Sequence, residues 1–328
     1  MSAATPVWVL DDPRPGTAGQ AIGIAERLGV PFRLVPMSWN RLAHIAVLAP
    51  RGSPIGWAST AGAEAEGLAM VRGADEPPAL TISAGSRSAA AALWLRRRFA
   101  CRSVHCMRPP LVGDRFDLLV VPQHDRGPSG PNVMPVLGVP HRVSPDALRR
   151  AREIWSERLG HLPQPRVALL VGGPIRGGDL QPSLAHRLAR QVARLANTRR
   201  GSVMATTSRR TGSEATEAVA AGLDAAMHLM FRWGEPGENP YLGFLAMADA
   251  IVVSADSVSM VSEACATEAP VFVALPELAG GRHRRLHHSL IEAGQVRMLE
   301  DSLSPWSREP LDEAGHVADA IRRLVKLD

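Results

Sequence analysis

The chain has 328 residues, of which 45% are hydrophobic and 21% are charged, and its formal net charge is +5. This composition excludes a disordered chain, and the length favours two domains. Lys326 is the only lysine, so arginine supplies nearly all of the positive charge. A Walker A loop is excluded, because its lysine would have to follow a glycine-rich turn. We interpret the arginine excess as codon bias, and no nucleic-acid partner is expected.

The cysteine content and the length of the apolar runs indicate the cellular compartment of the protein. Cys101, Cys106 and Cys265 are too few for a disulfide framework, and no fourth ligand joins them at zinc-site spacing. We therefore expect reduced thiols and no metal site. The apolar runs all fall short of the roughly 18 residues that a membrane-spanning helix needs. The N-terminus has no basic region typical of a signal peptide, and these patterns together predict a cytoplasmic protein.

Short apolar runs alternate with helical patterns through the first half of the chain. A glycine-containing loop and a helix over 20–28 follow the first of these runs, and the loop SAGSRS opens a second helix. Such alternation favours a parallel sheet that is covered by helices on both faces. The predicted strands cover residues 7–10, 32–35, 79–83, 103–107 and 118–121.

A polar helix over 145–159, with Ser144 as its N-cap, interrupts this pattern. The proline-bracketed segment 161–165 then indicates an interdomain linker. Strand and helix patterns resume after it, with strands at 166–171, 202–206, 227–231, 250–253 and 271–274. One helix is predicted over 182–197 and another after TTSRRT. A third starts near Asn239-Pro240, with the asparagine as N-cap, and a fourth follows the SADS loop and runs through residue 266. We predict an N-terminal domain over 1–162, a second domain over 163–308, and a terminal helix in 309–328 that packs back on the first domain.

Two glycine-containing loops follow predicted strands, where doubly wound sheets bind ligands. In the first, Gly16 and Thr17 permit close approach of a ligand, although a tight turn explains them equally well. The loop is not a GxGxxG motif, so a nicotinamide enzyme is disfavoured. In the second, the backbone N–H groups of Gly172 and Gly173 could face a phosphate and Arg176 could add charge. A plain turn remains the alternative there too.

Two further loops combine hydroxyl groups with charge. Ser208 and Arg209 lie in TTSRRT at a strand end, a composition that suits phosphate oxygens. The alternative is a capped helix with solvated arginines. In SADSVSMVSE, Asp256, Ser257 and Ser259 lie at a predicted helix N-terminus. The carboxylate at position 263, four residues beyond the last serine, shares its helical face and could accept two hydrogen bonds from a ribose. The alternative is a serine-rich cap with a surface glutamate.

The segment AMADAIVVSADSVSMVSEACATEAPVFV resembles the donor site of GT-B glycosyltransferases. Residues 15–275 resemble bacterial members of the plant mitochondrial fission (elongated-mitochondria) family. The resemblance is carried by the segments PGTAGQAIGIAERLG, VALLVGGPIR, TTSRRT and NPYLGFLAMADAIVVSADSVSMVSEA. The resemblance implies an α/β, GT-B-like fold with two Rossmann-like domains that face a central cleft. The first domain would bind the acceptor and the second the nucleotide-sugar donor. It implies that Ser257 and Ser259 meet the diphosphate and Glu263 the ribose. Ala269 departs from the family pattern, where glycine is usual.

Sugar transfer also needs a base for the acceptor hydroxyl. The first glycine loop ends in Gln20, where many such transferases carry a histidine. His124 and Asp125 follow a strand of the first domain, and a histidine there has a suitable ordinary pKa. A structural His–Asp pair is the alternative, and Asp11 and Asp12 are weaker candidates.

These observations predict a metal-independent glycosyltransferase that takes a nucleotide-diphosphate sugar as co-substrate and has no resident cofactor. The resemblance implies a role in envelope polysaccharide assembly, so the expected acceptor is a lipid-linked sugar or a polysaccharide. Basic clusters at 96–102 and 282–288 suit peripheral contact with the inner face of an anionic membrane; solvated faces or ligand phosphate contacts explain them as well. The resemblance also leaves open a non-catalytic adaptor, as in plant relatives that recruit a dynamin-related protein, and a nucleotide-sugar epimerase.

Overall fold

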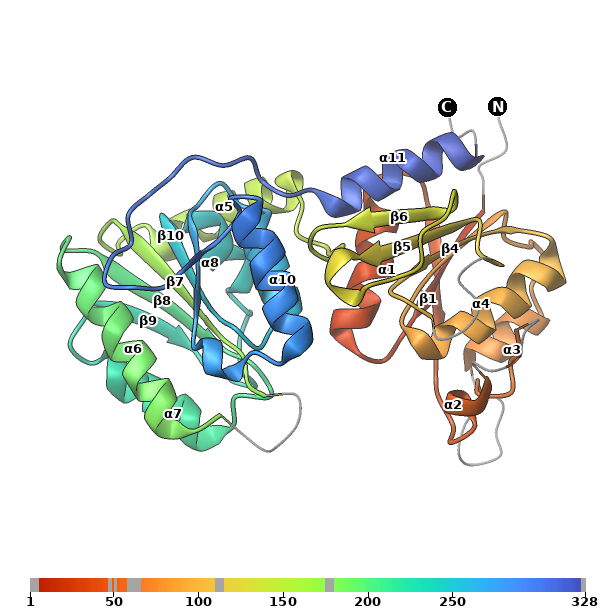
Figure 1. The fold of residues 1–328 in the computed structure, drawn as a ribbon. Coiled ribbons are helices and arrows are strands. Elements are labelled where there is room, and N and C mark those ends of the chain that lie inside the picture. The colour runs from red at the N-terminus through yellow and green to blue at the C-terminus, as the bar shows by residue number, and fades with distance from the viewer. Residues whose placement is uncertain are drawn as a thin grey trace. The chain divides into compact units, whose positions relative to one another are not determined.

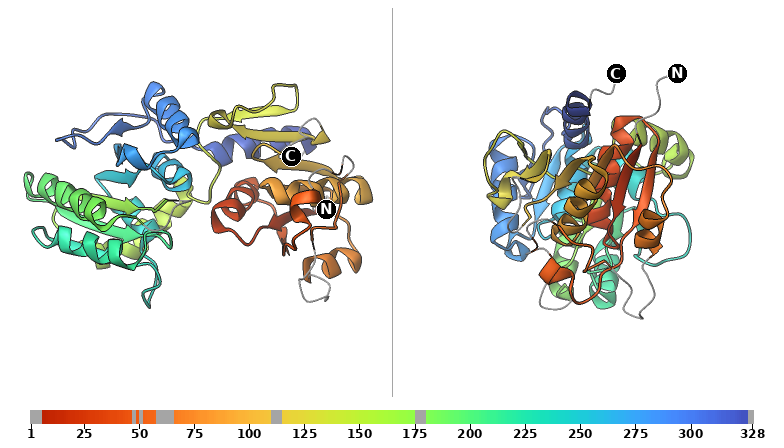
Figure 2. Two further views of the ribbon diagram at one scale, coloured as in Figure 1. Left: turned by 60° about the horizontal axis from the view of Figure 1, so that its bottom comes forward. Right: turned by 90° about the vertical axis from the view of Figure 1, so that its right-hand side faces the viewer.

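A computed structural model describes residues 6–46, 49, 52–57, 66–109, 115–174 and 180–325 of the chain. It divides into two compact units, shown in Figures 1 and 2. Unit 1 comprises residues 1–142 and 312–328, and unit 2 comprises residues 143–311. Each unit is built around one parallel sheet, which confirms the prediction of two Rossmann-like βα folds.

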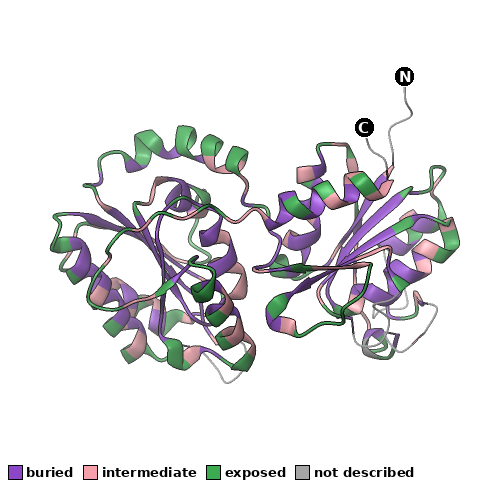
Figure 3. Ribbon diagram, turned by 45° about the horizontal axis from the view of Figure 1, so that its top comes forward, coloured by how far each residue is buried: buried purple, intermediate pink, exposed green. Residues whose placement is uncertain are grey.

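The sheet of unit 1 has six parallel strands in the order β2-β1-β3-β4-β5-β6. Its strands are β1 (Val7–Asp11), β2 (Phe32–Pro36), β3 (Leu80–Ala84), β4 (Arg102–Cys106), β5 (Leu118–Pro122) and β6 (Val133–Val136). The central strands are buried along their length (Figure 3), because helices cover both faces of the sheet. Those helices are α1 (Pro15–Leu28), α3 (Glu66–Arg72), α4 (Ser86–Phe99) and α11 (Glu313–Val325), and the short α2 (Ala43–Ala46) packs against α4.

The last helix of the chain completes the core of unit 1. Helix α11 packs against α1, and its apolar face contributes Val317 and Ile321 to the core that contains Ile24. Glu313 Oε1 accepts hydrogen bonds from the backbone N–H groups of Leu137 and Gly138, at 2.6 and 3.1 Å. The C-terminal segment is therefore part of this unit, and its helix begins at residue 313, four residues later than the sequence pattern predicts.

The sheet of unit 2 has the strand order β12-β11-β10-β7-β8-β9, again all parallel. Its strands are β7 (Arg166–Val171), β8 (Ser202–Thr207), β9 (His228–Phe231), β10 (Ala250–Ser254), β11 (Val271–Ala274) and β12 (Arg297–Met298). The helices are α5 (Pro145–Leu159), α6 (Pro182–Asn197), α7 (Ser213–Leu223), α8 (Tyr241–Met247), α9 (Val258–Cys265) and α10 (Gly281–Glu292). Strands β7 and β10 are neighbours from which the chain winds in opposite directions, so the gap between them is a topological switch point.

The predicted boundary at residue 162 differs from the observed one at residue 142. Helix α5 belongs to unit 2, where it packs against α8, and Gly243 lies so close to the Trp155 ring that a Cβ would approach Cγ to 2.4 Å. The predicted linker 161–165 also lies inside this unit, because the Arg166 guanidinium donates to the carbonyl of Leu162 at 3.1 Å. The contact between α5 and α8 is non-local, so the proline pattern of 161–165 could not reveal it.

Smaller differences concern element ends. Strand β6 and helix α10 were not predicted, and Pro240 rather than Asn239 is the N-cap of α8. Asn239 still accepts a hydrogen bond at its side-chain oxygen from the backbone N–H of Tyr241, at 3.0 Å. Within the described part of the chain, the helices all fall short of the length and apolarity that crossing a bilayer requires.

Candidate functional site

The loops after β7 and β10 meet at the switch point of unit 2. The Gly172 N–H donates to Ser254 Oγ at 2.7 Å, and the Gly173 N–H donates to Asp256 Oδ2 at 2.6 Å. Glycine is required at both positions. A Cβ on Gly173 would lie 1.9 Å from the carbonyl oxygen of Arg210, and one on Gly172 would lie 2.3 Å from Asp256 Oδ2. The glycines expected to present N–H groups to a phosphate thus bind side chains of the chain itself.

The loop after β8 lies against the same strand end. Thr211 Oγ1 donates to the carbonyl oxygen of Gly172 at 2.6 Å and accepts a bond from the Ser208 N–H at 2.9 Å. The turn places the Arg210 guanidinium 3.8 Å from Asp256 Oδ2. Ser208 therefore shapes the turn, Arg209 is exposed, and the neighbouring arginine reaches the carboxylate. Arg176 of the second glycine loop lies outside the described residues.

Asp256 is the centre of this cluster. It is only 1% exposed, and helix α10 brings two histidines toward it. Burial lowers the pKa of His283, and the nearby Asp256 acts in the opposite direction. Burial also lowers the pKa of His287 to about 4, and this ring lies within electrostatic range of Asp256. We call Gly172, Gly173, Arg210, Asp256 and His283 the switch-point cluster.

Helix α9 begins beside the cluster. Ser257 is its N-cap, with an extended backbone, and its Oγ accepts a hydrogen bond from the Met260 N–H at 3.3 Å. Ser259 is half-buried in the first turn. First-turn N–H groups of a helix have no partner within the helix and attract anions. The two serines therefore lie where the sequence predicts a diphosphate site.

Glu263 lies one turn further along α9 and is paired with a tyrosine. Tyr241, from the first turn of α8, donates its hydroxyl to Glu263 Oε2 at 2.5 Å. Glu263 keeps some exposed surface, yet burial raises its pKa to about 7, and the tyrosine hydrogen bond offsets only part of this rise. The pKa of Tyr241 is raised well above its ordinary value by burial and by the nearby carboxylate. The glutamate is thus neither a free surface residue nor fully available to a ligand.

Sequence reasoning missed three residues near these loops: Tyr241, His283 and Trp233. Trp233 follows β9, is 55% exposed, and donates its backbone N–H to Thr207 Oγ1 at the end of β8, at 3.1 Å. The only available signal for the tyrosine was its place at the predicted helix start after Asn239-Pro240. The histidine was noted only as part of a basic cluster.

In unit 1, the first glycine loop forms the start of α1. Gly16 is exposed and Thr17 is buried. The methyl group of Thr17 lies close to Gly85, where a Cβ would approach it to 2.7 Å. Arg14 holds Asp12 in a two-pronged ion pair, with hydrogen bonds of 2.7 and 2.9 Å. This loop therefore packs two helix starts together, and Asp12 is committed to its arginine.

The candidate base pair lies in the 3-10 helix η2 (Gln123–Asp125), which follows β5. His124 is buried, and its Nε2 lies 3.8 Å from Asp125 Oδ1. This separation is an ion-pair distance only when the imidazole is protonated, and it is too long for a hydrogen bond. Strands β3 and β4 lie between β5 and β1 in the sheet, so this pair is also separate from the glycine loop.

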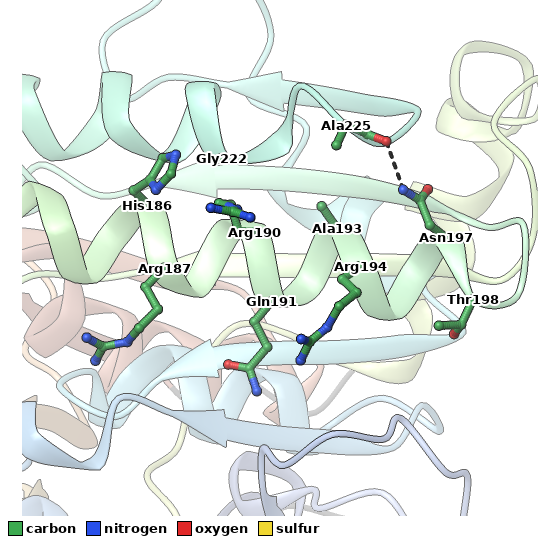
Figure 4. A pocket seen from close by; sticks show the side chains of 10 residues that line it. All are labelled: His186, Arg187, Arg190, Gln191, Ala193, Arg194, Asn197, Thr198, Gly222 and Ala225. Carbon is green, nitrogen blue, oxygen red and sulfur yellow. Dashed lines mark hydrogen bonds between the residues drawn. The ribbon is translucent and has the colours of Figure 1, made fainter.

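A surface groove of about 850 Å³ runs along α6 beside α7, as Figure 4 shows. Two of its arginines are neutralised, Arg187 by Glu277 at 2.8 Å and Arg194 by Asp301 at 2.9 Å. The groove lies on covering helices, whereas ligands of doubly wound sheets bind at the carboxyl ends of strands. It is therefore distinct from the switch-point cluster. Among the described residues, histidine, cysteine and carboxylate side chains form no group suited to a metal ion.

Comparison with known sequences gives two relatives and a family. Residues 15–325 match the sequence family described as Mitochondrial fission ELM1. The Mitochondrial fission protein ELM1 of Arabidopsis thaliana is 29% identical over 313 residues, covering 85% of this chain and 72% of that protein. An uncharacterized protein of Rickettsia prowazekii (strain Madrid E) is 24% identical over 361 residues, covering 98% of this chain and 99% of that protein.

Comparison with solved structures identifies the fold. The UDP-GlcNAc 2-epimerase of Methanocaldococcus jannaschii, in complex with UDP-GlcNAc and UDP, aligns with a TM-score of 0.54 at 13% identity. The alignment covers 98% of this chain and 99% of the epimerase. At that identity the likeness concerns the fold alone, and it confirms the GT-B-like fold predicted from the sequence.

Proposed function

The chain belongs to the mitochondrial fission ELM1 family, and on this premise we propose that it binds a nucleotide-diphosphate sugar in unit 2 and transfers the sugar without a metal ion. The observation that carries the proposal is the start of α9 at the β7–β10 switch point, with Glu263 one turn further along the helix. A GT-B-like neighbour solved with UDP-GlcNAc and UDP supports this class of ligand.

Each part of the ligand has a chemical partner in unit 2. The first-turn N–H groups of α9, with the hydroxyls of Ser257 and Ser259, suit the diphosphate, and the Arg210 guanidinium adds positive charge. Tyr241 engages one oxygen of Glu263, so the other oxygen can accept a ribose hydroxyl. The exposed indole of Trp233 offers an aromatic face to the base. Helix dipole and arginine stabilise the leaving diphosphate without a metal.

The acceptor hydroxyl needs a general base, and we assign this role to His124, with Asp125 beside it in η2. The proposed acceptor is a lipid-linked sugar or a polysaccharide of the cell envelope. Peripheral contact with an anionic membrane would bring such an acceptor within reach. In the basic cluster 96–102, Asp117 holds Arg96 and Arg102 at 2.9 and 2.7 Å. Arg98 lies over the rings of Trp94 and Phe99, so Arg97 is the arginine we assign to this contact.

Calorimetric titration of the full chain with UDP, GDP, CMP and their sugars tests the proposal. A ligand at 100 times its dissociation constant should also add about 2.7 kcal/mol to the free energy of unfolding. We expect Glu263→Ala to weaken nucleotide binding about tenfold, because a ribose acceptor is lost. Glu268→Ala removes an exposed glutamate of the same unit and serves as the matched control. Failure of all these ligands to bind the folded protein at millimolar concentration would reject the proposal.

A second candidate is a non-catalytic adaptor that retains the fold. The observation in its favour is that the chain's own side chains engage the ligand-binding groups: Asp256 the Gly173 N–H, and Tyr241 the carboxylate of Glu263. An adaptor should keep its cellular function in a folded Ser257→Ala/Glu263→Ala variant, and loss of that function would argue against it. An epimerase would convert UDP-GlcNAc without an acceptor, so product analysis in its absence separates that activity from transfer.

A further inference from the structure

The switch-point cluster contains a buried carboxyl group. Asp256 Oδ2 accepts the Gly173 N–H at 2.6 Å and lies 3.8 Å from the Arg210 guanidinium. Its second oxygen, Oδ1, has no hydrogen-bond partner among the described residues. His287 is likewise buried, and within the same described set its Nε2 lacks a partner. The carboxylate thus has one satisfied oxygen and one buried oxygen without a hydrogen-bond partner among the described residues.

The groups around Asp256 are those that bind phosphate. A backbone N–H beside a helix N-terminus and an arginine recognise phosphate oxygens in proteins, and carboxylates use the same donors. The site also lies at the carboxyl end of β7 and β10, where doubly wound folds place their ligands. A diphosphate at this position would compete with Asp256 for the Gly173 N–H and for Arg210, and it would place a like charge beside the aspartate.

We propose that Asp256 is an internal anion that occupies part of the phosphate position of unit 2, so that a diphosphate binds only by displacing its carboxylate. This inference rests on the proposed function and adds a specificity-determining residue to it. The aspartate weakens diphosphate binding. It therefore favours ligands whose remaining contacts, at α9 and Glu263, compensate for the free energy of displacing the carboxylate. Inorganic pyrophosphate has no ribose to contact Glu263 and should therefore bind the natural chain less tightly than UDP does.

Asp256→Asn tests this inference directly. The amide has the shape of the carboxylate, and its oxygen can still accept the Gly173 N–H, so the loop should keep its conformation. Without the negative charge, we expect pyrophosphate and UDP to bind at least tenfold more tightly by calorimetry, which is about 1.4 kcal/mol. Asp256→Ser, which also removes the carboxylate, replaces the first variant if the first does not fold in a thermal melt.

Two further variants separate a local effect from a general one. Asp249 lies at the start of β10, at the opposite end of the sheet, and accepts the Arg166 N–H at 2.7 Å. Asp249→Asn makes the same change in net charge and should leave pyrophosphate affinity within twofold of the natural chain. Adding Arg210→Gln to Asp256→Asn should abolish the gain, because the arginine that the anion would use is removed.

The outcomes distinguish this inference from the proposed function. If UDP binds the natural chain and Asp256→Asn binds it no more tightly, the inference fails while the proposed function stands. If pyrophosphate binds Asp256→Asn more tightly but UDP and the other nucleotides bind no variant, the inference stands and the proposed function fails. If Asp249→Asn gains as much affinity as Asp256→Asn, the effect is one of net charge and the inference is overturned. Absence of all binding in every folded variant overturns both.

Discussion

The buried carboxyl group of Glu263 should make the stability of unit 2 depend on pH. Its pKa is raised from 4.5 to about 7, mainly by burial. Below pH 4.5 the group is protonated in both the folded and the unfolded chain. As the pH rises from 4.5 to 7, the unfolded chain ionises while the folded chain holds the proton, so stability is lost. Above about pH 7 both states are ionised, and no further loss from this group is expected.

The magnitude follows from the size of the pKa shift. A shift of one pKa unit corresponds to about 1.4 kcal/mol, so the full change for Glu263 is up to about 3 kcal/mol. Glu263→Gln cannot ionise, and its amide oxygen can still accept the Tyr241 hydroxyl. The variant should therefore match the natural chain near pH 4.5 and exceed its stability by up to about 3 kcal/mol near pH 8.

Hydrogen exchange of the β7 and β10 amides as a function of denaturant measures the opening free energy of unit 2 by itself. Glu268→Gln, at an exposed position shortly after α9, is the control and should show the same pH dependence as the natural chain. Parallel pH profiles for Glu263→Gln and the natural chain between about pH 5 and pH 8 would refute the reasoning, because the carboxyl group would then titrate alike in both states.

Three other substitutions test separate parts of the structure. Burial raises the pKa of Asp117, but hydrogen bonds from two arginines outweigh this effect and hold the pKa at about 2. Replacement by asparagine should lower the free energy of unfolding by about 2 kcal/mol at neutral pH. Urea unfolding should show this difference shrinking as the pH falls from 4 towards 2. Gly173→Ala should lower the melting temperature by several degrees, because the new Cβ would meet the Arg210 carbonyl at 1.9 Å; an unchanged melt would contradict the close approach. Tyr241→Phe removes a hydrogen bond that lowers the pKa of Glu263, so carbon NMR should find this carboxyl titrating at a higher pH, and an unchanged or lower value would disprove the pairing.

The adaptor and transferase hypotheses make opposite demands on Asp256 and Tyr241. In an adaptor, the two side chains would complete a closed interior, and nothing would need to displace them. In a transferase, they would be partners that a nucleotide exchanges for its own groups. Binding measurements on the Asp256 and Glu263 variants therefore bear on both hypotheses, because they ask whether this end of the sheet can accept a ligand.

The sequence by itself determined the local elements. Apolar runs such as 166–171 and 271–274 match strands β7 and β11 residue for residue, and the helix over 182–197 matches α6. Ser144 is an N-cap as predicted, and Ser257 caps α9 in the serine-rich segment where the sequence placed a helix N-terminus. These features depend on residues close together in the chain, through side-chain periodicity, capping and turn chemistry. The GT-B-like fold followed from that alternation and from the family resemblance.

Only the tertiary structure decided which of the predicted loops meet. Gly173 and Asp256 are 83 residues apart in the chain, yet they share a hydrogen bond because β7 and β10 are neighbours in the sheet. Tyr241 of α8 reaches Glu263 of α9, although 22 residues and strand β10 separate them in the chain. Strand order is set by how the sheet buries its faces, and no local pattern records it. A glycine loop that local chemistry offers to a phosphate is therefore held instead by an aspartate from a distant part of the chain.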